Sequence, residues 1–153
     1  MLPMMAEPPI SPPMSGPGQA ALDDLAETFD LLGDWEERYR YVIDLGSELT
    51  PLADAEKTAA TKVSGCASQV WIVADPRTDG RLEWRGDSDA HIVRGLIAIL
   101  LRLYNGLTPD EALAFDARAA VARLGLGEAL SSQRSNGLSA MIARLRSDAQ
   151  TSR

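Results

Sequence analysis

Two short strand-like segments follow one another in the middle of the chain, and the segments on either side have helical periodicity. This pattern limits the possible fold classes more than any other feature of the sequence. Residues 69–74 are apolar on both faces and rich in β-branched and aromatic side chains, as in a strand covered on both sides. Residues 81–85 alternate strictly, with Leu82 and Trp84 inward. Because turn residues fill positions 75–80, we expect an antiparallel hairpin. One hairpin among helices predicts an α+β fold, a small antiparallel sheet packed against several helices.

The segments before and after this hairpin have the periodicity of amphipathic helices, and helix start and stop signals lie at their ends. The expected helices run from Gln19 to Gly33, from Asp34 toward Gly46, from a cap at Asp87, Ser88 or Asp89 to Tyr104, from Thr108 to Gly125 with room for a bend near Asp116, and onward from about Ser135. The third is apolar around most of its circumference and is expected to be central and buried. Gly95 inside it costs about 1 kcal/mol relative to Ala, which predicts close backbone packing against the sheet or the cysteine-bearing loop.

The domain organisation follows from a change in composition near residue 19. Residues 1–18 hold six of the nine prolines and four of the five methionines without an apolar period, so we expect a disordered tail. Residues 19–148 are expected to form a single domain. Residues 149–153 are expected to be a short C-terminal tail.

Charge and hydropathy limit the partners. The net charge of -7 would repel phosphate backbones and anionic headgroups, so neither nucleic acid nor a membrane surface is an expected partner. The longest purely apolar run, residues 96–101, is far shorter than the roughly 20 residues that cross a bilayer. The first positive charge is Arg38, so the start lacks the basic region of a secretory signal. We expect a cytoplasmic protein.

Cys66 is the only cysteine and His91 the only histidine. One cysteine forms no internal disulfide, and these two residues alone cannot build a structural zinc site. Without context a lone intracellular cysteine is more often a small buried hydrophobe than a nucleophile. Here the preceding Gly65, small neighbours and a position between elements favour a reactive thiol. Nearby Ser64, Ser68 and Lys62 are expected to lower its pKa.

The residues around Cys66 also carry a family resemblance. Residues 63–71, Val-Ser-Gly-Cys-Ala-Ser-Gln-Val-Trp, resemble the V-x-G-C-x-S-x-V-W segment of SufE-type proteins. Further similar blocks lie at residues 34–46, 86–96 and 132–141, in the same order along the chain. Four separated blocks over about residues 20–147 are much more specific than one motif.

The resemblance implies a SufE/IscU-like fold and a role in sulfur transfer. In this family a PLP-dependent cysteine desulfurase, of the SufS or CsdA type, passes persulfide sulfur to the SufE cysteine, and Cys66 matches that position. The resemblance implies an accessory protein that stimulates the desulfurase and delivers sulfur to a SufBCD-type scaffold or another acceptor, rather than an enzyme in its own right. PLP belongs to the partner, so no cofactor or metal is expected here. One cysteine speaks against cluster assembly on this chain.

Four further residues are candidates for supporting the site: Gly65, Ser68, Asp89 and Arg134. Asp89 is expected chiefly as a helix N-cap, and its family position beside the sulfur site adds it to the candidates. Arg134 lies near the start of a helix, where a cation opposes the macrodipole. It is either solvated or paired with an acid such as Glu128, or it contacts the Cys66 loop or the partner.

Two other functions compete with the sulfur carrier. A single-cysteine thiol peroxidase or redox sensor would use the same activated thiol on an oxidant, although no resolving partner is identifiable. An adaptor with an inert Cys66 is the structural alternative.

Overall fold

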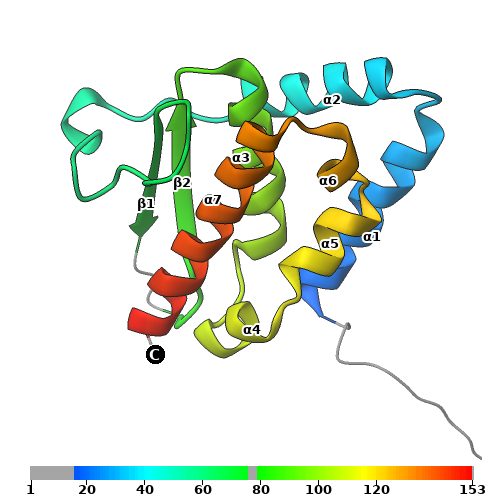
Figure 1. The fold of residues 1–153 in the computed structure, drawn as a ribbon. Helices are drawn as coiled ribbons and strands as arrows, with labels where there is room; N and C mark the ends of the chain where they lie inside the picture. Colours follow the sequence, from blue (N-terminus) through cyan, green and yellow to red (C-terminus); the bar gives the residue numbers. More distant parts are fainter. Residues whose placement is uncertain (1–15, 76–78, 153) are drawn as a thin grey trace, which may run out of the picture.

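The computed structural model describes residues 16–75 and 79–152 and has the predicted α+β architecture (Figure 1). The elements are α1 Pro17–Leu31, α2 Trp35–Ser47, the short 3-10 helix η2 Asp54–Glu56, β1 Val70–Asp75, β2 Glu83–Ser88, α3 His91–Tyr104, α4 Pro109–Ala114, α5 Ala117–Arg123, α6 Leu126–Ala129 and α7 Ser132–Thr151. Strands β1 and β2 form an antiparallel pair in which Val70 lies opposite Ser88 and Asp75 opposite Glu83. Within the described residues, no helix is both long and apolar enough to span a bilayer.

Helix α3 is the central element, as its sequence predicts. Eleven of its fourteen residues are buried, and it packs against α2, β2, α1 and α7. Gly95 marks the closest approach, because a Cβ there would overlap the carbonyl oxygen of Val42 on α2. The expectation of close backbone packing at Gly95 is therefore confirmed, but the neighbour is α2 and neither the sheet nor the cysteine loop.

The second strand begins and ends later than predicted. It includes Gly86, Asp87 and Ser88, which we had expected at or before the start of the next helix, and the N-cap of α3 is Ala90. Asp87 is buried and does not cap a helix: its carboxylate accepts from the adjacent Ser88 N–H and from the distant Leu52 N–H, and it pairs with Lys57 and Arg94. Long-range partners thus replace the local cap that the sequence favoured.

The segment from Thr108 to Gly125 contains two helices, α4 and α5, which are separated at the bend expected near Asp116. Thr108 forms the predicted capping box with Glu111, but Phe115 is extended and Asp116 caps a new helix, α5. The half-buried Phe115 ring packs edge-on against Tyr104 at 5.5 Å, a contact that favours the extended backbone at the break. Helix α6 was not predicted.

Both predicted ends of the domain need adjustment. Helix α1 begins at Pro17, so the predicted tail is too long by two residues, and residues 1–15 lie outside the described part of the chain. Helix α7 begins at Ser132, not near Ser135, with Ser131 as its N-cap. It continues to Thr151 with Ala149 fully buried. The prediction of a tail from residue 149 is wrong, because Ala149 continues the apolar face of α7.

Candidate functional site

Cys66 lies in a short loop that we call the cysteine loop, residues 64–69. The stem of this loop has two arms: residues 60–63 run antiparallel along residues 70–72, the first part of β1. The backbone N–H of Val63 donates to the carbonyl of Val70 at 2.8 Å, and that of Ile72 donates to Thr61 at 2.8 Å. Gly65 has φ of +91°, a backbone conformation that favours glycine, so it makes the turn into Cys66. The loop is thus closed at its base by backbone hydrogen bonds.

The tip of the cysteine loop rests on helix α7. The Sγ of Cys66 lies 3.7 Å from the carbonyl oxygen of Gly137, and a Cβ on Gly137 would lie 3.6 Å from that sulfur. Gly65 faces Ala140 one turn further along the same helix. Small residues on this face of α7 therefore provide a shallow seat for the half-buried thiol.

Burial against α7 raises the pKa of the Cys66 thiol, because desolvation penalises the thiolate. We expected Lys62, Ser64 and Ser68 to lower it. That expectation is wrong for this conformation: Lys62 and Ser64 are exposed, Ser68 is half-buried, and desolvation is the effect that acts on Cys66. Contact with α7 thus favours the protonated form of the half-buried thiol.

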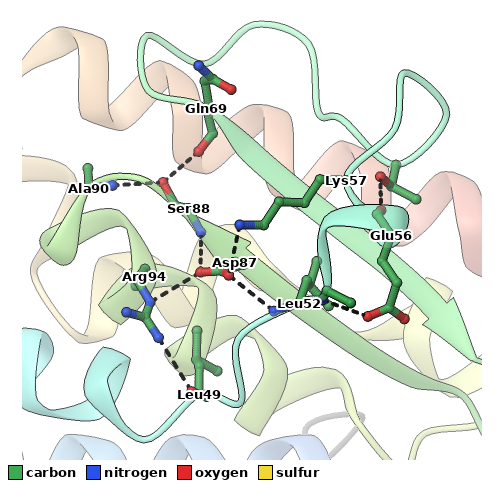
Figure 2. A network of polar contacts seen from close by, with 11 residues as sticks. Leu49, Leu52, Glu56, Lys57, Gln69, Asp87, Ser88, Ala90 and Arg94 are labelled. Carbon is green, nitrogen blue, oxygen red and sulfur yellow. Dashed lines mark hydrogen bonds and ion pairs between the residues drawn. The ribbon is translucent and has the colours of Figure 1, made fainter.

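The far end of the cysteine loop is tied to the end of β2 (Figure 2). The Asp89 carboxylate accepts a hydrogen bond from the N–H of Gln69 at 3.1 Å. The Ser88 hydroxyl donates to the Gln69 carbonyl at 2.7 Å and accepts from the N–H of Ala90. Asp89 is therefore not the helix N-cap that we expected, but it does lie at the loop. Because it holds the last residue of the cysteine loop, it keeps its place among the candidates.

A buried ionic cluster around Asp87 supports that loop end (Figure 2). The Asp87 carboxylate accepts from the N–H of Leu52 at 3.1 Å and pairs with Arg94 at 3.3 Å and Lys57 at 3.7 Å. Since Asp87 is buried, these partners compensate for its desolvation. The cluster fixes the segment after α2 to β2 and α3, directly before the two residues that hold Gln69.

Arg134 lies in the first turn of α7, one turn before Gly137, and is exposed. Its guanidinium donates to the Tyr39 hydroxyl of α2 at 2.9 Å and lies over the Tyr39 ring at 6.0 Å. It therefore binds neither the expected Glu128 nor Cys66. The structure brings Arg134 to the same end of α7 as the thiol, with the guanidinium oriented toward α2.

Gly137 is the site residue whose role sequence reasoning missed. It stands in a block similar to the SufE family, yet no role was assigned to it. The available signal was a glycine inside a helix, the same signal that pointed to close packing at Gly95.

His91 is exposed at the start of α3. Over residues 16–75 and 79–152, no group of three or more His, Cys, Asp or Glu side chains is arranged to hold a metal ion.

Comparison with known proteins decides the family. The model of the SufE family, an Fe-S metabolism associated domain, matches residues 23–149, which include the cysteine loop, Asp89, Arg134 and Gly137. The chain belongs to the SufE family.

Two relatives agree with this assignment, and a solved structure has a similar fold. An uncharacterized SufE-like protein of Rhizobium etli is 50% identical over 134 residues, covering 86% of this chain and 90% of the relative. One of Rhizobium meliloti strain 1021 is 46% identical over 133 residues, covering 85% and 95%. The solution structure of a hypothetical protein from Thermus thermophilus matches with a TM-score of 0.71 at 20% identity, over 86% of this chain and 95% of that one. At that identity the match concerns the fold alone.

Proposed function

We propose that Cys66 accepts persulfide sulfur from a PLP-dependent cysteine desulfurase and passes it on for iron-sulfur cluster assembly. The observation that carries the proposal is the placement of the sole cysteine of a SufE-family chain on a glycine-turned loop seated on α7. A buried structural cysteine would not need a turn with positive φ or a shallow seat. The donor is a desulfurase of the SufS or CsdA type, and the acceptor is a SufBCD-type scaffold or another sulfur-using protein.

The transfer is a thiol exchange in which atoms and charge balance. The thiolate of Cys66 attacks the outer sulfur of the donor persulfide, and a new S–S bond forms on Cys66. The bond between that sulfur and the donor cysteine breaks, and the donor leaves as a thiolate that takes up a proton. One thiol and one persulfide exchange places, so no oxidant or reductant is consumed. The chain needs no metal or acid-base pair of its own for this step.

The resting geometry protects the thiol rather than activating it. A neutral, half-buried Cys66 reacts slowly with oxidants and small thiols. Docking of the desulfurase must therefore lift the tip of the cysteine loop from α7, which removes the desolvation and lowers the pKa of Cys66. The single hydrogen bond from the Cys66 thiol to the Gly137 carbonyl is easily broken in this motion, because a thiol is a weak hydrogen-bond donor.

The direct test is intact-mass spectrometry after incubation with a cysteine desulfurase and cysteine. The wild-type chain should gain about 32 Da on Cys66, and a thiol reductant should remove it, as expected of a persulfide. Cys66→Ser should gain nothing while still binding the desulfurase. A gain that resists the reductant would mark sulfinic acid and favour a redox sensor. An unmodified wild-type chain would contradict the proposal and favour an adaptor.

A further inference from the structure

Arg144 connects helix α7 to the stem of the cysteine loop. It lies seven residues after Gly137, so both residues share one face of the helix, about 10 Å apart along its axis. The guanidinium donates to the carbonyl of Ala60 at 2.8 Å, and to those of Lys62 and Ile72 at 3.4 Å. One side chain thus bonds to both arms of the stem.

Asp148 holds this guanidinium in place. It lies one turn after Arg144, and one carboxylate oxygen pairs with the Arg144 Nε at 3.3 Å. The other oxygen accepts from the indole N–H of Trp84 at 3.1 Å. Because Trp84 is buried on β2, the carboxylate is anchored to the sheet. A continuous polar chain therefore runs from β2 through α7 to the stem.

The two attachments of the cysteine loop to α7 differ in strength. At the tip, a weak thiol donor lies at 3.7 Å from one carbonyl. At the stem, a charged planar group with several donors binds three carbonyls. The tip is thus the part that gives way first.

We propose that Arg144 is a positioning residue for sulfur transfer, which fixes the stem of the cysteine loop on α7 so that Cys66 leaves its seat while the stem stays. This inference rests on the proposed function for its role in transfer, but the hold on the loop stands on the geometry alone. The fixed stem limits where the persulfide-bearing tip can move and so presents the sulfur in one direction. A loop without the stem contact would expose the thiol more often and deliver it less accurately.

The experiment compares Arg144→Ala with Arg146→Ala, a matched control on the same helix whose guanidinium donates to Leu113 and not to the stem. The first readout needs no desulfurase: the rate at which Cys66 reacts with a small aromatic disulfide, measured across pH. Arg144→Ala should react about threefold to tenfold faster at neutral pH with a lower pH midpoint, because a thiol that leaves its seat loses the desolvation that raises its pKa and is therefore ionised more often. Arg146→Ala should match the wild type.

The second readout is single-turnover sulfur transfer from a desulfurase persulfide, per folded molecule. The transfer rate should fall about tenfold in Arg144→Ala. It should fall less in Arg144→Lys, because the lysine keeps the charge but its ammonium cannot bind three carbonyls in one plane. Unchanged reactivity and transfer in Arg144→Ala, or equal changes in Arg146→Ala, would overturn the proposal.

If Arg144→Ala does not fold, Asp148→Asn answers the same question. It keeps the guanidinium but weakens its hold, so the pH profile of Cys66 should move in the same direction by less. An unchanged profile in both Asp148→Asn and Arg144→Lys overturns the positioning role. If the wild type accepts no sulfur, the proposed function and the transfer role both fail, whereas the reactivity readout still decides whether Arg144 holds the loop.

Discussion

At the scale of single residues, contact with α7 controls the reactivity of Cys66. Desolvation raises the pKa of this thiol from the ordinary value of 9.0. We therefore expect the alkylation rate of the free protein to rise with a pH midpoint above that ordinary value. A peptide with the sequence of residues 63–71 is the control, because it has the same neighbours without α7. A midpoint equal to that of the peptide would show that the seat on α7 is not occupied in solution.

The raised pKa of Cys66 also determines how the stability of the seated loop changes with pH. The seated thiol holds its proton to higher pH than the unseated thiol, so the seated state binds more protons between the two pKa values. The contribution of this seat is complete below the pKa of the unseated thiol and is lost as pH rises through the raised pKa. Alkaline conditions should therefore favour the lifted loop.

Arg134 offers a second prediction at this scale. Its bond to the Tyr39 hydroxyl is exposed, and such contacts contribute at most about 1 kcal/mol to folding. If Arg134 contacts the docked desulfurase, Arg134→Ala should weaken binding or sulfur transfer with little change in melting temperature. Tyr39→Phe is the control, because it removes the hydroxyl and keeps the ring beneath the guanidinium. Lower stability with normal transfer per folded molecule in Arg134→Ala would leave the residue a structural role alone.

At the scale of elements, two helix glycines should respond oppositely to one substitution. Gly95→Ala should destabilise by about 1 to 3 kcal/mol, because the new methyl group overlaps Val42 where α2 crosses α3. Gly137→Ala should stabilise by up to about 1 kcal/mol, since its Cβ meets the Cys66 sulfur at an ordinary contact distance and alanine favours the helix. Denaturant unfolding of both variants gives the comparison. Strong destabilisation in Gly137→Ala would mean that the thiol sits closer to α7 than the structure has it.

Some elements of the fold are predictable from the residues within and next to them, and others are not. Periodicity and caps predicted the hairpin, the central helix and the start at Thr108, because each signal lies within a few residues of the element that it defines. The end of β2 was predicted wrongly because Asp87 resembles a cap and is satisfied instead by Leu52, Arg94 and Lys57. The bend near Asp116 was expected, but the ring contact between Phe115 and Tyr104 at that bend was not. Neither the partners of Asp87 nor this ring contact is visible within a local window of sequence.

At the scale of the whole molecule, the site also has a part that local sequence predicts and a part that depends on contacts between distant segments. Cys66 and the turn at Gly65 were predictable because a glycine-cysteine pair between elements is a local pattern. The seat on Gly137, the Asp89 hydrogen bond to Gln69 and the Arg144 contact join segments 20 to 84 residues apart in sequence. The direction of the Cys66 pKa shift also follows from these distant contacts, which explains why neighbours in sequence suggested the opposite sign.

The end of α7 provides the last prediction, because it closes the polar chain that reaches the cysteine loop. Deleting residues 149–153 removes the fully buried Ala149 and leaves Asp148 at a frayed terminus. A loss of about 1 kcal/mol should lower the melting temperature of a domain of this size by roughly 2 to 4 °C. Deleting residues 152 and 153 is the matched control, since it keeps the helix through Thr151, and should change little. Because Asp148 orients Arg144, the longer deletion should also speed the reaction of Cys66 with a small disulfide at neutral pH. Equal melting temperatures and thiol reactivity in the two truncations would show that the last turn of α7 is not needed to hold the loop.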